Sequence, residues 1–178
     1  MKKLLLLFYF VLLSLPVLNA QSSVLSKDSA TLIFVRHAEK ADDGTSNPPL
    51  TKEGEARAER IMKMLKKTYT KVDAVYSTPY KRTEFTAAPT ATEFDLTVQE
   101  YDPRAPNVFV KSLLKDHRGE VVLIVGHSNT TPFLVNLVLG EEKFKQLDES
   151  AYDEVFIVNS TEVGKGKVEV KTSASKNN

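Results

Sequence analysis

The strongest constraint on this sequence is an apolar run that stops at two basic residues. Residues 31–35 read Thr-Leu-Ile-Phe-Val, and Arg36 and His37 follow directly. A continuous run of branched and aromatic residues predicts a strand buried on both faces, as in parallel sheets. Ligands of open α/β sheets bind beyond the carboxyl ends of the strands. We therefore expect Arg36 and His37 to face a cleft.

Strand and helix patterns alternate along the rest of the chain. The expected strands lie at 72–76, 97–98, 121–125, 155–158 and 168–170, and the expected helices begin at Thr51 and span 81–88, 108–114 and 133–139. Alternation of this kind is typical of an α/β domain. We predict a single three-layer α/β/α domain with a mostly parallel sheet, preceded by a signal peptide.

The first twenty residues have the pattern of a secretory signal peptide. Lys2 and Lys3 precede an apolar run over 4–13. Pro16 then breaks the run, and the small residue Ala20 suits cleavage. The alternative is an uncleaved anchor, but the run is shorter than the ~20 residues of a spanning helix. We predict a secreted or periplasmic protein with no stable membrane span after cleavage.

The predicted division of the chain follows from this cleavage. It is a signal peptide at 1–20, a spacer at 21–30, the folded domain at 31–171 and a flexible tail at 172–178. The chain has 24 Lys plus Arg and 23 Asp plus Glu, and cleavage would leave 22 basic residues. A near-neutral domain argues against a nucleic-acid partner. The chain has no cysteine, so its stability depends on the core alone.

Four cationic side chains follow three of the predicted strands. Arg36 and His37 follow the first, Arg82 comes shortly after the second, and His127 follows the strand at 121–125. Parallel strands place their carboxyl ends at one edge of the sheet, so the four side chains can meet there. Two Arg and two His suit a tetrahedral dianion, because guanidinium groups bind phosphate oxygens bidentately.

Each of these residues taken alone would more often be structural than functional. A single His after a strand is usually a hydrogen-bonded structural residue, and a single Arg usually lies on the surface. The coincidence at strand ends is what favours a site. The third histidine, His117, lies in a polar turn at 115–119, where we expect it to be exposed and uninvolved.

Four sequence blocks, in order, resemble motifs of the histidine phosphatase (phosphoglycerate mutase-like) superfamily, in its small phosphatase branch. They are Arg-His-Ala-Glu at 36–39, Leu-Thr-Lys-Glu-Gly at the start of 50–58, Ser-Thr-Pro through Thr-Ala at 77–87, and Gly-His-Ser-Asn at 126–129. The resemblance extends over 32–158. Ala38 stands where this family most commonly has Gly.

The resemblance implies a reaction and a site. His37 would be the nucleophile that becomes phosphorylated, and Arg36, Arg82 and His127 would complete the phosphate pocket. The cations would neutralise the phosphoryl oxygens, so no metal and no cofactor is expected. Water would then hydrolyse the phosphohistidine. The predicted partners are a phosphorylated small molecule or a phosphoprotein, while the oligomeric state stays open.

The group that protonates the leaving group stays open among acidic residues. Mutase-like members carry a Glu in the segment after the second Arg, and the candidates here are Glu100 and Asp102, with Glu84 behind them. The phytase branch carries an Asp directly after its second His, where this chain has Ser128 and Asn129. Each candidate acid could equally be a solvated surface residue or a helix-cap partner.

Three functions are compatible with these residues. The first is a phosphomonoester hydrolase acting through phosphohistidine on His37. The second is a non-catalytic phosphate-binding module on the same fold, and the third, less favoured, is a phosphoglycerate mutase, because the long insertions of full mutases are missing. The loop at 41–50 and the turn at 99–106 are expected to line the mouth of the pocket.

Overall fold

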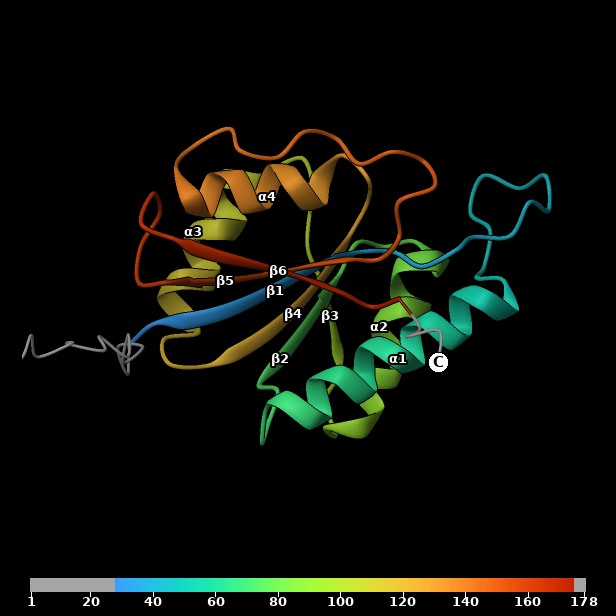
Figure 1. The fold of residues 1–178 in the computed structure, drawn as a ribbon, viewed down its shortest axis with the longest axis horizontal. Helices are drawn as coiled ribbons and strands as arrows, with labels where there is room; N and C mark the ends of the chain where they lie inside the picture. The colour runs from blue at the N-terminus through green and yellow to red at the C-terminus, as the bar shows by residue number, and fades with distance from the viewer. Residues whose placement is uncertain (1–27, 175–178) are drawn as a thin grey trace, which may run out of the picture.

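A computed structural model describes residues 28–174, which form one six-stranded sheet and four helices (Figure 1). In chain order the elements are β1 (Ala30–Arg36), α1 (Lys52–Thr68), β2 (Ala74–Ser77), α2 (Lys81–Glu93), β3 (Val98–Glu100), α3 (Pro106–Asp116), β4 (Val121–Gly126), α4 (Thr130–Leu139), β5 (Glu154–Ser160) and β6 (Lys167–Thr172). Every strand and helix expected from the sequence is present, with ends that differ by a few residues.

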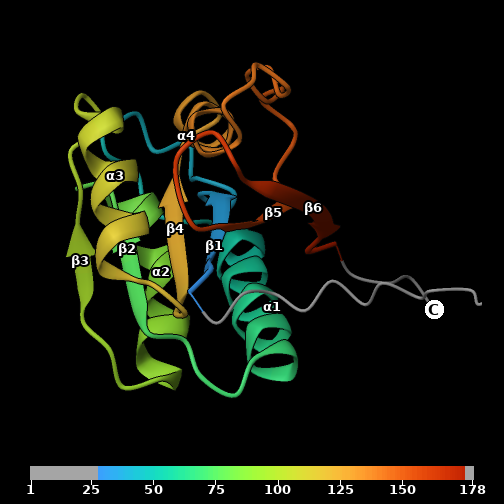
Figure 2. The same ribbon diagram turned by 90° about the vertical axis from the view of Figure 1, so that its left-hand side faces the viewer.

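The sheet is mixed and mostly parallel, with strand order β3-β2-β4-β1-β5-β6. The first four strands in that order are parallel, and β5 and β6 pair antiparallel at the other edge (Figure 2). Arg36 lies opposite Gly126, and Ser77 lies opposite Val125. This register brings the residues that follow β1, β2 and β4 to one end of the sheet.

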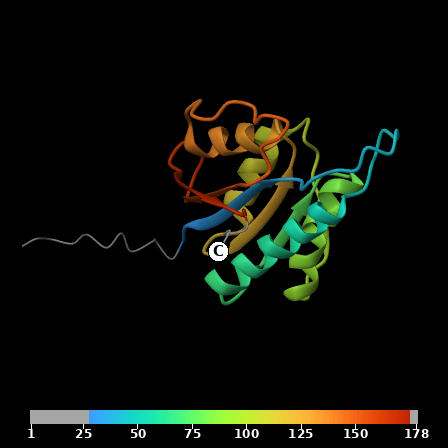
Figure 3. The same ribbon diagram turned by 45° about the vertical axis from the view of Figure 1, so that its right-hand side comes forward.

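Helices cover both faces of the sheet, which confirms the predicted three layers (Figures 1 and 3). Leu32 and Phe34 of β1 are buried with side chains of α3 and α4. Ile33 and Val35, which point to the other face, are buried with side chains of α1 and α2. The unbroken apolar run of β1 therefore has a simple cause: both faces of the strand are core.

Local signals explain where the helices begin and continue. The Thr51 side chain caps α1 by accepting a hydrogen bond from the Gly54 amide, as the sequence predicted. Glu53 and Glu55 occupy its first turn and basic residues its last, which complements the helix dipole. Helix α2 continues through Pro89 to Glu93 rather than ending at the proline.

The structure describes the C-terminal end of the predicted domain but not the segments before residue 28. The predicted signal peptide and residues 21–27 of the spacer lie outside the described residues. The predicted domain end at 171 falls inside β6, and Ser173, which follows that strand, is buried and hydrogen-bonded to the Asp153 carbonyl. The packed chain thus extends past the expected start of the tail. None of the helices within residues 28–174 combines the length and the hydropathy that a membrane span requires.

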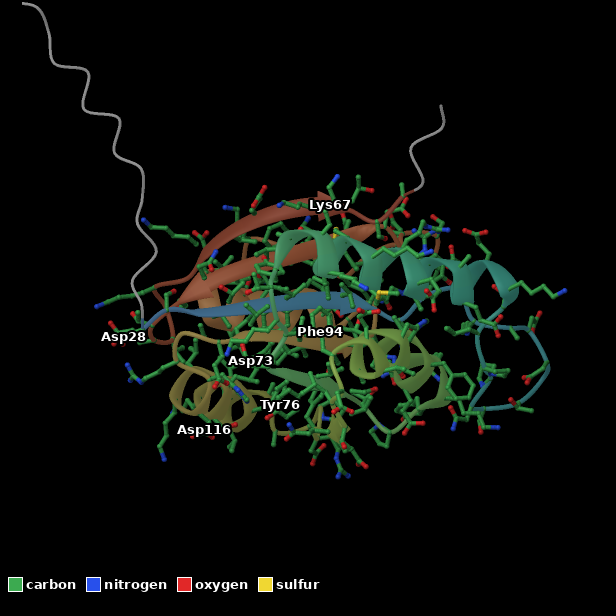
Figure 4. All side chains as sticks on the ribbon, turned by 90° about the horizontal axis from the view of Figure 1, so that it is seen from below. Asp28, Lys67, Asp73, Tyr76, Phe94 and Asp116 are labelled. Carbon is green, nitrogen blue, oxygen red and sulfur yellow. The ribbon has the colours of Figure 1, made fainter. Side chains whose placement is uncertain are left out.

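His117 is not the exposed turn residue that we expected. Its Nε2 lies 2.9 Å from the Tyr76 hydroxyl, and its Nδ1 lies 2.8 Å from a carboxylate oxygen of Glu120. Only 13% of its side chain is accessible, because the ring fills the junction between α3 and β2. Figure 4 shows Tyr76 on the same side of β1 as Asp116, the residue before His117. His117 comes shortly before the start of β4, whereas His127 follows its end, so the two rings lie toward opposite ends of the sheet.

Candidate active site

Arg36, His37, Arg82 and His127 line one cavity of about 310 Å³. The imidazole centroids of His37 and His127 lie 5.5 Å apart, with their planes 67° from parallel. The other lining residues are Lys40, Ser128, Asn129, Gln146 and Glu149. The structure thus brings together four side chains from three distant parts of the sequence, and their catalytic roles stay predictions.

The ends of the parallel strands hold these side chains in place. The His37 amide donates to the Gly126 carbonyl at 2.9 Å, which joins the segment after β1 to the end of β4. A Cβ at Gly126 would lie 2.8 Å from Thr130 Oγ1 and 2.9 Å from the Tyr101 hydroxyl. A larger residue at position 126 would therefore have to displace the Thr130 and Tyr101 hydroxyl groups, at the point where the chain turns from β4 into the residue that carries the second imidazole.

The hydrogen bonding of His37 fixes which ring nitrogen faces the cavity. Its Nδ1 lies 2.7 Å from the Ala38 carbonyl, which can only accept, so Nδ1 carries the proton and Nε2 keeps its lone pair. Burial, together with the positive charge of Arg36, lowers the pKa of His37 to about 3, although the bond to Ala38 opposes this shift. The ring is neutral at ordinary pH, as a nucleophile requires.

His127 is held by a buried chain of hydroxyl groups. Its Nδ1 lies 3.4 Å from Arg82 Nη2, which can only donate, so the ring proton belongs on Nε2. Nε2 lies 2.9 Å from the Thr78 hydroxyl, and that hydroxyl lies 3.0 Å from the Thr83 hydroxyl. Thr83 in turn donates to the Tyr80 carbonyl at 2.8 Å. Burial and the charge of Arg82 lower the pKa of His127 to about 4.

Arg36 is anchored by a segment that the sequence did not single out. Its Nη1 donates to the carbonyls of Asp148, Glu149 and Ala151 at 2.8–3.1 Å. Its guanidinium carbon lies 4.2 Å from the centroid of the Tyr152 ring. Arg36 is 2% exposed, and its Nε has no hydrogen-bond partner among the described residues. The sole signal in the sequence was an aromatic residue at 152 in an otherwise polar stretch.

Arg82 also packs against an aromatic ring, that of Tyr80. It lies in the first turn of α2, with its guanidinium carbon 4.4 Å from the centroid of the Tyr80 ring. Burial, with the charge of Arg36 beside it, lowers the pKa of Arg82. The Tyr80 ring also meets His127 edge-on, with centroids 5.2 Å apart. Tyr80 therefore packs against two of the four cationic residues.

The candidate acids lie apart from the four cations. Glu100 and Asp102 line neighbouring cavities with Tyr101, and Asp102 is bound to Arg104 at 2.9 Å. Glu84 is exposed on α2. These positions leave the identity of the proton donor a prediction.

One acid that the sequence reasoning missed does line the cavity. Glu149 contacts Arg36 Nη2 through a carboxylate oxygen at 3.0 Å, and 75% of its side chain is exposed. It belongs to a polar loop with no motif, so no sequence pattern distinguishes it from the other surface acids.

The two segments expected at the mouth of the cavity lie beside it. In the loop at 41–50, the Asn47 side chain accepts a hydrogen bond from the Lys81 amide at 2.9 Å, at the start of α2. The turn at 99–106 contributes to a neighbouring cavity that it shares with Tyr80. Lys40, directly before the loop, is the residue of this region that lines the site.

The charges of the cavity suit a phosphoryl group. Arg36, Arg82 and Lys40 are cationic, Glu149 is the one lining acid, and both imidazoles are neutral in the unliganded protein. A phosphate dianion would meet guanidinium donors beside a ring nitrogen that carries a free lone pair. Within residues 28–174, no group of three or more His, Asp and Glu side chains could hold a metal ion.

The sequence also matches the model of a known protein family. The model of the histidine phosphatase superfamily (branch 1) matches residues 32–104. No protein among those with curated functions matches this sequence.

Solved structures share the fold of this chain. The protein histidine phosphatase SixA, in complex with tungstate, is 18% identical with a TM-score of 0.67, and the match covers 80% of this chain and 97% of that one. The mycobacterial glucosyl-3-phosphoglycerate phosphatase is 13% identical with a TM-score of 0.65, covering 80% and 98%. A phosphoserine phosphatase mutant from Entamoeba histolytica, bound to phosphoserine, is 14% identical with a TM-score of 0.57, covering 83% and 98%. At these identities the likeness concerns the fold.

Proposed function

We propose that this chain, which belongs to the histidine phosphatase superfamily (branch 1), is a phosphomonoester hydrolase that needs no metal and acts through a phosphohistidine at His37. One observation carries the proposal: the hydrogen bond from His37 Nδ1 to the Ala38 carbonyl, which leaves the Nε2 lone pair available beside Arg36, Arg82 and His127. The substrate would be a phosphorylated small molecule or a phosphoprotein.

The reaction follows from these groups in two steps. The Nε2 lone pair of His37 attacks phosphorus, an N–P bond forms, and the ester P–O bond breaks as the alcohol leaves with its electron pair. The leaving oxygen takes a proton from an acidic group or from water. In the second step water attacks phosphorus and gives a proton back to the acidic group or to solvent. The N–P bond breaks with its electron pair returning to Nε2, and inorganic phosphate leaves with His37 restored. Arg36 and Arg82 neutralise the phosphoryl oxygens in both steps.

His127 has a distinct part in this scheme. Its pKa of about 4 in the unliganded protein reflects burial and the neighbouring Arg82. A bound dianion would offset that positive charge and favour the protonated ring, so His127 would take up a proton as phosphate binds. The resulting imidazolium would add a third charged donor at the transferring group.

Hydrolysis of p-nitrophenyl phosphate in the presence of EDTA tests the proposal. We expect turnover by the unmodified protein and a loss of at least about 1,000-fold in kcat/KM in His37→Gln, because the nucleophile is removed. His117→Gln is the matched control, since that ring lies at the opposite end of the sheet and should keep activity within a few-fold. Activity retained by His37→Gln would contradict the proposal.

A second candidate function, a non-catalytic phosphate-binding module, is favoured by one observation. None of the three acids expected to protonate a leaving group lines the cavity. This module would bind inorganic phosphate in a calorimeter yet leave p-nitrophenyl phosphate intact. Turnover that disappears in His37→Gln would eliminate it.

We also propose that the protein is exported, on the support of residues 1–20 alone. Expression of the full chain, followed by N-terminal sequencing of the protein recovered outside the cytoplasm, tests this. A chain that begins at Gln21 is the expected result, and a full-length chain retained in the cytoplasm would contradict export.

A further inference from the structure

A second, larger cavity of about 720 Å³ lies beside the phosphate site, between α4 and the segment at 140–146. Asn129 and Gln146 line both cavities, so the two meet at these residues. In Figure 1 the chain after α4 passes over that helix and returns toward the end of the sheet where the site lies. The larger cavity is therefore an extension of the phosphate site along the outer side of α4.

The floor of this groove is apolar. Phe133 is 49% exposed on α4 although it is a large aromatic residue, and Pro132 and Leu137 of the same helix also line the groove. Phe144 lines it from the facing segment. The charged lining residues Glu141, Glu142 and Lys145 are exposed, as expected at a rim.

The wall facing α4 is held in place by specific hydrogen bonds. The Asn136 side chain donates to the Phe144 carbonyl at 2.7 Å and accepts from the amides of Lys143 and Phe144 at 3.1 and 3.0 Å. At the other end of the wall the Leu147 amide donates to the Ser128 carbonyl at 2.9 Å. These hydrogen bonds hold the segment at 143–147 against α4 and the residues before it.

The end of the groove away from the site is bounded by the turn between β5 and β6. A Cβ at Gly140 would lie 2.6 Å from the Cα of Gly164, and the Gly164 amide donates to the Val138 carbonyl at 3.0 Å. This close approach brings Val163, which is 44% exposed, to the groove. The ten residues of α4 are about 15 Å long, which is enough for an extended ligand group.

We propose that this groove binds the apolar part of the substrate: the protein prefers phosphomonoesters of an extended apolar alcohol or phenol. The inference rests on the proposed function. The phosphate would occupy the cationic cavity, and the organic group would pass Asn129 and Gln146 to lie on Phe133, Leu137 and Phe144. Burial of each additional methylene group in such a groove should tighten binding about twofold to fourfold.

Binding of two phosphonates, which cannot be hydrolysed, tests the groove without any need for turnover. Phenylphosphonate and 4-butylphenylphosphonate have similar charged groups and differ by four carbons. We expect calorimetry to give a Kd at least about tenfold lower for the butyl compound. Phe133→Ser and Val163→Ser should each reduce that ratio to about threefold or less, while the affinity for inorganic phosphate stays within twofold.

Two control variants remove exposed apolar side chains elsewhere. Phe85→Ser on α2 and Val170→Ser on β6 match the groove variants in chemistry and exposure, and both should keep the full ratio. Equal affinities for the two phosphonates in the unmodified protein would overturn the proposal, as would a ratio that both groove variants keep. Loss of p-nitrophenyl phosphate turnover alone would count against the proposed hydrolase and leave this binding test intact.

Discussion

At the scale of single residues, the orientation of His127 depends on hydroxyl groups that do not face the cavity. Thr78 is fully buried, and its hydroxyl joins the ring to Thr83. A valine at this position has nearly the same shape but cannot accept from Nε2. The Nε2 proton would then lose its acceptor, while Nδ1 would still face Arg82.

We expect Thr78→Val to lower kcat/KM about tenfold and to cost about 1–2 kcal/mol of stability, since one buried hydrogen-bonding partner is lost. Thr78→Ser keeps the hydroxyl and should recover most of the activity. Initial rates with p-nitrophenyl phosphate and urea unfolding measure the two effects. Equal activities of the Val and Ser variants would mean that the hydroxyl does not position His127.

The sequence could predict the two arginines and two histidines of the site but not Lys40 or Glu149. Arg36, His37 and His127 directly follow apolar strands, and the geometry of parallel sheets brings such positions together. Glu149 comes from a loop that reaches the cavity through its own backbone contacts with Arg36. Loop conformation of this kind depends on tertiary contacts, and one sequence carries no periodic signal for it.

At the scale of elements, Arg57 of α1 joins three separate segments. Its guanidinium contacts both carboxylate oxygens of Glu39, the carboxylate of Asp153 before β5, and the Ser173 hydroxyl after β6. Burial disfavours the ionised form of Glu39, but its hydrogen bonds with Arg57 outweigh that effect and lower the pKa of Glu39. The segment directly after His37 is thereby fixed to α1.

We expect Arg57→Met to reduce the free energy of unfolding by about 3 kcal/mol, because it leaves the partly buried Glu39 carboxylate without its partner. Arg60→Met is the control: Arg60 lies one turn along the same helix, and its carboxylate partner Glu53 is largely exposed, so the cost should stay below about 1 kcal/mol. Urea denaturation measures both values. Similar costs for the two variants would show that the Arg57 contacts contribute little.

Predictions for whole elements succeeded where the pattern was long and periodic. The apolar run at 121–125 and the capped helix beginning after Thr51 needed no tertiary information. The direction of β5 could not be read in the same way, since an apolar run looks alike in parallel and antiparallel strands. Ser173 falls in the predicted flexible tail because residues 172–178 are polar and lack apolar spacing. Its burial depends on Arg57 and Asp153, which are distant in sequence.

At the scale of the whole molecule, the two cavity imidazoles make stability depend on pH. Their pKa values are about 3 for His37 and about 4 for His127, against 6.5 in an unfolded chain. Between these values the unfolded state binds more protons, so the free energy of unfolding falls as the pH is lowered below about 6.5. The slope is up to about 1.4 kcal/mol per pH unit for each imidazole.

Urea unfolding between pH 7 and 5 checks this, in a range where most carboxylates stay ionised. We expect the free energy of unfolding of the unmodified protein to fall over this range, and the decline to be much smaller in a His37→Gln, His127→Gln double variant. His117→Gln, which alters neither cavity imidazole, should keep most of the decline. An unchanged decline in the double variant would show that these rings do not cause it.

The central claim of a covalent phosphohistidine can be tested by trapping the intermediate. A phosphoramidate is labile in acid but stable in alkali, so the reaction with p-nitrophenyl phosphate should be stopped in alkali within milliseconds and the peptides identified by mass spectrometry. We expect a phosphoryl group on the peptide at His37 that is absent in His37→Gln and present in His117→Gln. Active enzyme that shows no phosphoryl group on His37 at any time during turnover would contradict it.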